Sequence, residues 1–138
     1  MVNEIISFEA AELAQQKGFD LKCRGYYQTK EYKYSNLKNP ILRQNGTSHG
    51  IKNYNNQNNK WVKAYGLVSA PTQSLLQRWL REKYNIHAFV IPISKRYHSH
   101  CIEYGNKLVD SRPIGTYKSY EEALERALIE GLKLIDNG

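Results

Sequence analysis

The chain has 138 residues, enough to bury one hydrophobic core without the help of disulfides or metal ions. Hydrophobic residues make up 41% of it and charged residues 24%, which excludes a disordered chain, and the longest apolar run, near residues 87–93, is too short to cross a membrane. The formal net charge of +7 favours an anionic partner over a cationic one.

The N-terminal part, residues 1–28, is expected to hold one helix and a possible strand. Ser7 suits a helix N-cap, Glu12 lies near the positive end of the helix that follows, and Gly18 is typical of a helix C-terminus. Residues 20–28 carry apolar side chains that would face inward from a short strand.

Residues 29–60 differ from the rest in composition. Eight asparagines fall within residues 30–60, among them Asn45 before a glycine and a nearly unbroken run at 53–59. Asparagine side chains compete with backbone pairing and tolerate left-handed conformations, so they favour turns. We therefore predict a long, basic loop rich in Asn and Tyr over this range.

Residues 61–138 are expected to form an α+β core. The alternation at 61–68 predicts a strand, and Leu76 and Leu80 mark the apolar face of a helix that begins near Pro71. A strand at 86–93 and a hairpin around Gly105 follow, and a capping box that opens at Ser119 begins the last helix.

The fold class is therefore predicted as α+β, with a short antiparallel sheet packed with two amphipathic helices in the order helix–strand–hairpin–helix. The N-terminal helix and the long loop precede it. The whole chain, residues 1–138, is interpreted as a single domain.

The cysteines and the N-terminus bear on location. Cys23 and Cys101 lie far apart and follow no disulfide-scaffold or metal-binding spacing. The first residues lack the basic and apolar regions of a secretory signal. We expect a reduced, cytoplasmic protein, with no membrane partner and no cofactor.

The positive charge is concentrated in one segment. Nine Lys or Arg and a single acid, Glu31, lie between Lys22 and Lys63, and tyrosines alternate with the first of these cations. Cations neutralise phosphates, and aromatic rings stack on bases at about 1–3 kcal/mol each. The residues predicted to bind an anionic ligand are Lys22, Arg24, Tyr26, Lys30, Tyr32, Lys33, Tyr34, Lys38 and Arg43. Alternatively, some of these tyrosines belong to the core. Tyr27 and Tyr65 are then the first expected there, and Tyr32, Tyr34 and Tyr54 are the last.

Metal and catalytic sites are the alternatives to an anion-binding segment. His98 and His100 share one face of a predicted strand, and His87 on the neighbouring strand would complete three imidazole ligands for zinc. No paired-Cys or HExxH motif accompanies them, so no metal site is predicted. Cys101 and the two neighbouring histidines alternate in direction along the strand, which separates a nucleophile from its base, so no catalytic residue is predicted either.

One resemblance to a known family is carried by several short motifs. The stretch PTQSLLQRWLRE at 71–82, NIH at 85–87 and YEEALE at 120–125 resembles a recurrent small protein of Bacteroidetes gut phages and prophages. The opening ISFEAAELA at 6–14 is similar to that family's start. The resemblance covers about two-thirds of the chain, is weak between residues 28 and 60, and implies a phage origin without implying catalytic residues.

These observations predict a non-catalytic phage accessory protein that binds an anionic, nucleotide-containing ligand. That ligand is either nucleic acid or a small nucleotide sequestered from host defence signalling. The alternative is a structural or host-protein-interaction protein that acts as a homo-oligomer, with Trp79, Leu80 and the Asn-rich loop at its interface.

Overall fold

A computed structural model describes residues 4–31, 35–44, 50–93, 98–105, 107–111 and 117–136. The chain divides into two compact units: the N-terminal unit, residues 5–72, and the C-terminal unit, residues 1–4 and 73–138. Both combine helices with a three-stranded antiparallel sheet, so the predicted α+β class is confirmed. No helix in the described ranges is long and apolar enough to cross a membrane.

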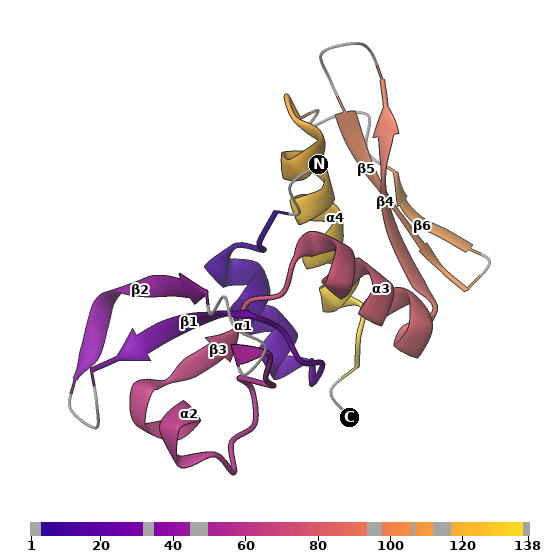
Figure 1. The fold of residues 1–138 in the computed structure, drawn as a ribbon. Coiled ribbons are helices and arrows are strands. Elements are labelled where there is room, and N and C mark those ends of the chain that lie inside the picture. Colours follow the sequence, from indigo (N-terminus) through magenta and orange to yellow (C-terminus); the bar gives the residue numbers. More distant parts are fainter. Residues whose placement is uncertain are drawn as a thin grey trace. The chain divides into compact units, whose positions relative to one another are not determined.

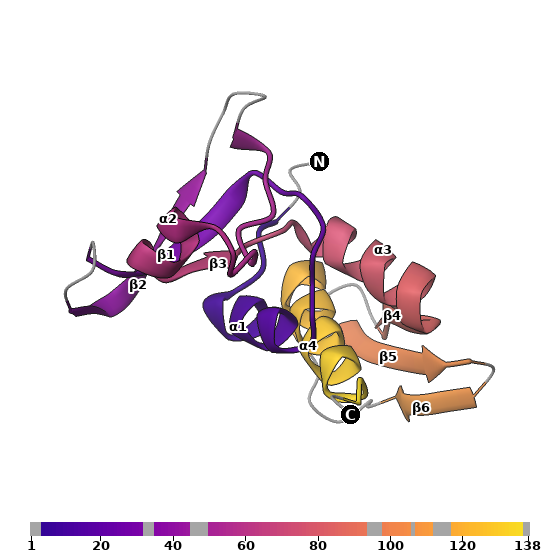
Figure 2. The same cartoon turned by 90° about the horizontal axis from the view of Figure 1, so that it is seen from below.

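The C-terminal unit contains two helices and one sheet. Its elements are α3 (Gln73–Tyr84), β4 (Ile86–Pro92), β5 (His98–Tyr104), β6 (Lys107–Ser111) and α4 (Tyr120–Lys133). The strands pair in the order β4-β5-β6, and the two helices cover one face of the sheet (Figures 1 and 2). The predicted order of helix, strand, hairpin and helix is confirmed.

The core of this unit lies between the helices and the sheet. Leu80, Ile86 and Leu128 are completely buried there. At Gly131, α4 approaches the sheet so closely that a Cβ atom would lie 3.3 Å from Ile86 Cγ2. Trp79 is only 3% exposed, so the interface predicted on Trp79 and Leu80 is wrong: both side chains belong to the core.

Local signals set the ends of these elements, at Ser119 as predicted. The Ser119 side chain accepts a hydrogen bond from Glu122 N and caps α4. Asn85 ends α3 with a positive φ of 55°. Pro92 is the last residue of β4, where its missing N–H costs no pairing in the sheet interior.

The N-terminal unit contains α1 (Phe8–Gln16), β1 (Gly25–Lys30), β2 (Asn36–Gln44), α2 (Lys60–Tyr65) and β3 (Leu67–Ser69). The antiparallel strands run in the order β2-β1-β3. Helix α1 packs against β3, and the short α2 packs against β3 and β1 (Figure 1). The N-cap at Ser7 and the left-handed Gly18 after α1 are as predicted.

The loop predicted at 29–60 is wrong in its first half, because β2 occupies Asn36–Gln44. This strand is polar and mostly exposed, and it lies at the sheet edge, where Pro40 is tolerated. Its composition therefore gave no strand signal, and its pairing with β1 holds it in place.

The strand predicted at 61–68 is also wrong over most of its length. Asn59 accepts hydrogen bonds from Trp61 N and Val62 N and thereby begins α2. Gly66, with a φ of 56°, ends that helix in the left-handed conformation. Only the last part of the predicted strand survives, as β3.

The run of asparagines at 53–59 is an ordered connection built from side-chain hydrogen bonds. Asn53 Oδ1 accepts from Asn55 N and Asn56 Oδ1 accepts from Asn58 N, so successive side chains close tight turns. Asn55 Oδ1 accepts from Ser69 N at 2.9 Å, and Asn55 Nδ2 donates to Phe19 O at 2.9 Å. Asn55 therefore joins the edge of β3 to the end of α1.

The division into units at residues 72 and 73 was not predicted from the sequence, which placed its boundaries at 28 and 60. The interpretation of residues 1–138 as a single domain stays a prediction.

Candidate functional site

A hollow of about 670 Å³ lies within the N-terminal unit and receives side chains from every helix and strand of that unit. We call it the lysine hollow. It is lined by Phe8, Glu12, Gln15, Thr29, Lys30, Asn36, Leu37, Lys38, Pro40, Gln57, Val62, Lys63, Gly66, Leu67 and Val68.

Three lysines from three different elements line this hollow. Lys30 is the last residue of β1, Lys38 lies in β2 and Lys63 lies in α2. All three are exposed, and none of them forms an ion pair with another described residue. Glu12 is the one acid among the lining residues that the structure describes, so the formal charge of these residues is +2. Like charges gathered at one place repel each other, and an anionic ligand relieves that repulsion.

Backbone features place these lysines. The register of β1 against β2 shifts between Gln28 and Lys30, so the last part of β1 is displaced relative to its partner. The Thr29 hydroxyl donates to Gly66 O at 2.7 Å, and Thr29 N donates to the same oxygen at 3.2 Å. These bonds fix the end of β1 next to the end of α2, and therefore hold Lys30 near Lys63.

The walls of the hollow combine apolar and polar groups. Phe8 contributes an aromatic ring, held edge-on to Tyr27 with the centroids 5.3 Å apart. Leu37 and Val62 add aliphatic surface, while Gln15 and Asn36 add amides. Small-molecule sites in proteins generally have volumes of roughly 300–1,000 Å³ and mostly apolar walls. This hollow has such a volume, but eight of its fifteen described lining residues are polar or charged.

The residues predicted to bind an anionic ligand do not all meet here. Of those that the structure describes, only Lys30 and Lys38 line the hollow. Lys22 and Arg24 are exposed on either side of Cys23, whose backbone pairs with Lys52. Arg43 donates through Nε to Gln28 Oε1 at 3.0 Å.

Two further parts of that prediction concern tyrosines. Tyr26 lies against Tyr54, with ring centroids 4.5 Å apart. Tyr54 was expected outside the core but is only 7% exposed, and its hydroxyl donates to Gly50 O at 2.6 Å. Tyr32, Lys33 and Tyr34 lie outside the described residues.

One thiol and one tyrosine hydroxyl of this unit have raised pKa values. Burial raises the pKa of the Cys23 thiol above its ordinary 9.0, against smaller opposing effects of hydrogen bonds with Ser69, Ala70 and Gly25. Burial also raises the pKa of the Tyr54 hydroxyl above 10.0, and Tyr26 and Cys23 add to the effect. A thiolate is the reactive form of cysteine, so burial makes Cys23 a poor nucleophile at neutral pH.

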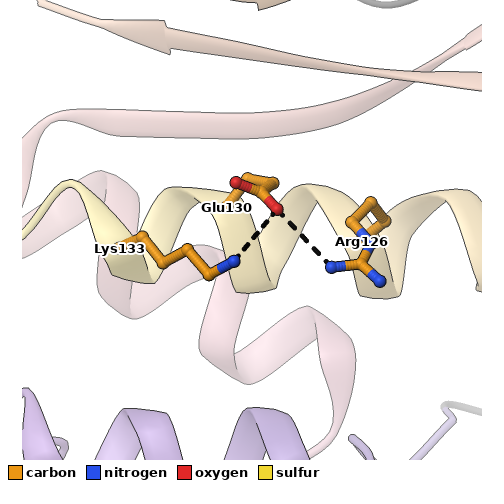
Figure 3. Close-up of polar contacts among 3 residues, drawn as sticks. All are labelled: Arg126, Glu130 and Lys133. Carbon is orange, nitrogen blue, oxygen red and sulfur yellow. Dashed lines mark hydrogen bonds and ion pairs between the residues drawn. The ribbon is translucent and has the colours of Figure 1, made fainter.

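The C-terminal unit offers a different charge pattern. It holds ten Lys or Arg and nine Asp or Glu, against ten and four in the N-terminal unit, and so carries +1 of the net +7. On α4, Glu130 lies between two cations: Arg126 Nη1 at 3.5 Å and Lys133 Nζ at 3.3 Å (Figure 3). Basic side chains on this helix face are therefore neutralised locally.

The imidazole cluster considered from the sequence does not assemble. His87 pairs with Glu103 across the sheet, whereas His98 pairs with Pro92, so His87 and His98 lie on opposite faces. His87 Nε2 instead lies 2.9 Å from Asn85 Oδ1. Cys101 is 2% exposed.

Sequence reasoning missed most of the lining, including Glu12, Gln15 and Lys63. Lys63 belonged to the basic segment but was expected in a strand. Glu12 and Gln15 are three residues apart on the predicted first helix, which puts them on one face. That spacing is a usable signal, but nothing in the sequence says which segment the face meets.

Comparison of the chain with models of protein families, with curated proteins and with solved structures gives no match to any of them.

Proposed function

We propose that this protein is a non-catalytic binding protein that holds a small nucleotide in the lysine hollow. The observation that carries the proposal is the meeting of Lys30, Lys38 and Lys63, none of them ion-paired with a described residue, around a cavity of about 670 Å³. Lysine ammonium groups bind phosphate oxygens through charge-assisted hydrogen bonds. The Phe8 ring and the aliphatic walls suit the flat face of a base.

A non-catalytic role is supported by two potential nucleophiles of this unit, Thr29 and Cys23, because one is hydrogen-bonded and the other is buried. The Thr29 hydroxyl, which lines the hollow, already donates to Gly66 O. Cys23 is buried and does not line the hollow. The resemblance to a phage family supports a phage origin. A phage protein that binds a nucleotide without chemistry could sequester a host defence nucleotide in the bacterial cytoplasm.

Single-stranded nucleic acid is the second candidate ligand, and one observation favours it. Trp61 is 49% exposed, it stacks on Tyr65 with the ring centroids 6.2 Å apart, and Lys60 Nζ lies 5.2 Å from its ring. An exposed aromatic pair beside a cation is a usual platform for bases. This platform is not part of the hollow lining.

Calorimetric titration tests the proposal with two matched triple variants. We expect Lys30→Gln/Lys38→Gln/Lys63→Gln to weaken the binding of nucleoside diphosphates about 100-fold, because each lost charge-assisted contact at an exposed site costs roughly 1 kcal/mol. Lys22→Gln/Arg24→Gln/Lys60→Gln removes the same charge outside the hollow, and we expect it to change the affinity less than about threefold.

Two results would contradict the lysine hollow as the site. One is a wild-type protein that binds no nucleotide. The other is an equal loss of affinity in both triple variants, which would place the anion on the general basic surface. Tighter binding of a short single-stranded oligonucleotide than of any mononucleotide, with a steep dependence on salt, would favour the second candidate.

A further inference from the structure

Helix α1 contributes hydrogen-bond acceptors to the hollow, whereas the lysines contribute cationic donors. Glu12 and Gln15 both line the hollow, and they lie three residues apart on α1. A carboxylate accepts hydrogen bonds and donates none. In the part of the chain that the structure describes, no ion pair involves Glu12.

The amide of Gln15 is fixed so that only its oxygen is left for a ligand. Gln15 Nε2 donates to Asn55 Oδ1 at 3.0 Å and to Leu67 O at 3.2 Å. The orientation of Asn55 is itself fixed, because its oxygen accepts from Ser69 N and its nitrogen donates to Phe19 O. Both donor hydrogens of Gln15 are therefore used, and Gln15 Oε1 remains an acceptor.

The hollow consequently presents acceptors from α1 and cations from β1, β2 and α2. Glu12 and Gln15 Oε1 would bind N–H groups, while Lys30, Lys38 and Lys63 would bind phosphate oxygens. A fitting ligand carries negative charge at one end and adjacent hydrogen-bond donors at the other.

Among nucleotides, guanine meets this demand best. Its Watson–Crick edge places the ring N1–H beside the exocyclic N2 amino group, so two neighbouring donors can reach one carboxylate. Adenine offers one amino group next to the acceptor N1, and cytosine offers one next to the acceptor N3. Uracil flanks its single N–H with two carbonyl oxygens. Each of these three bases would turn an acceptor toward a carboxylate.

We propose, on the basis of the proposed function, that the ligand of the lysine hollow is a guanine nucleotide, selected by Glu12 and Gln15. Glu12 accepts hydrogen bonds from the donor edge of the base. Gln15, whose amide is fixed by Asn55, supplies a further acceptor to the same base. The lysines contribute affinity for any nucleotide and no preference between bases.

The test is calorimetric titration of the full-length protein with GDP, IDP and ADP at one salt concentration. IDP lacks only the N2 amino group, so we expect it to bind roughly tenfold more weakly than GDP. ADP leaves the carboxylate facing an acceptor, and we expect it to bind about 100-fold more weakly.

Two variants of α1 complete the test. Glu12→Gln should bring GDP down to about the affinity of IDP and leave ADP within about threefold of its wild-type value. Glu9→Gln removes the same charge from the same helix outside the hollow, and it should preserve the preference for GDP.

The outcomes separate this inference from the proposed function. Equal affinity for the three nucleotides, or tighter binding of ADP, would overturn the guanine assignment, and the proposed function would stand if the triple lysine variant still lost binding. Failure of all three to bind would overturn both. A GDP preference that survives in Glu12→Gln would overturn the role assigned to Glu12.

Discussion

Replacing Asn55 by alanine is expected to lower the free energy of unfolding of the N-terminal unit by about 3 kcal/mol. The side chain makes three hydrogen bonds, with Gln15, Phe19 and Ser69. Ser69 is fully buried and Phe19 is 1% exposed, so the alanine variant would leave the buried Ser69 N–H without its partner and would remove a hydrogen bond from the buried Phe19 carbonyl. An unsatisfied buried polar group costs more than the hydrogen bond itself contributes.

Urea unfolding, followed by far-UV circular dichroism and by hydrogen exchange of the β1 and β3 amides, measures this loss in the unit concerned. Asn56→Ala is the matched control. Asn56 is exposed and its side chain accepts one local hydrogen bond from Asn58 N, so we expect a loss below about 1 kcal/mol. Equal losses in the two variants would show that the asparagines act only as turn formers.

Replacing Gly66 by alanine is expected to cost a similar amount, about 3 kcal/mol, and to weaken nucleotide binding as well. Its φ of 56° disfavours any residue with a Cβ atom. A Cβ atom here would also collide with the Thr29 hydroxyl and lie 3.1 Å from Lys30 Cγ. The substitution therefore disturbs the bonds to Gly66 O that hold the end of β1, and with them Lys30.

Gly18→Ala separates the two causes of that cost. Gly18 has a φ of 90° after α1, but a Cβ atom there would meet nothing within 4 Å. We expect only the backbone strain, about 1 kcal/mol, and unchanged nucleotide affinity. Thermal and urea unfolding of both variants, with a titration of each, make the comparison. A loss in Gly18→Ala as large as in Gly66→Ala would contradict the contact with Thr29.

The C-terminal unit was largely predictable because its signals are local. A capping serine at 119, a left-handed Asn85 and a turn at Gly105 act within a few residues of where they stand. Helical periodicity at 73–84 and 120–133 then identified the faces that are buried. Each of these features can be read without knowledge of the rest of the chain.

The N-terminal unit was predicted less well because its order comes from distant partners. Strand β2 is polar along its length and is set by its pairing with β1. Tyr54 is buried because it meets Tyr26 and Gly50, and Asn55 is ordered through residues 36 and 14 positions away in sequence. None of these partners follows from composition.

The candidate site shows the same limit. Counting charges was enough to single out Lys30 and Lys38. Lys63, Glu12 and Gln15 join them only because α1, β1, β2 and α2 meet around one hollow. The sequence therefore singled out two of the cations that line the hollow and not the shape of the site. The kind of ligand, an anion with a base, stays a prediction.

The most direct test of the account is to locate the bound nucleotide on the protein. Titration of ¹⁵N-labelled protein with GDP, followed by amide chemical shifts, reports every residue whose surroundings change. We predict the largest changes at Thr29, Lys30, Lys38, Lys63 and Gly66, which line the hollow. Changes centred on residues 73–136, or no change at saturating nucleotide, would contradict the lysine hollow as the binding site.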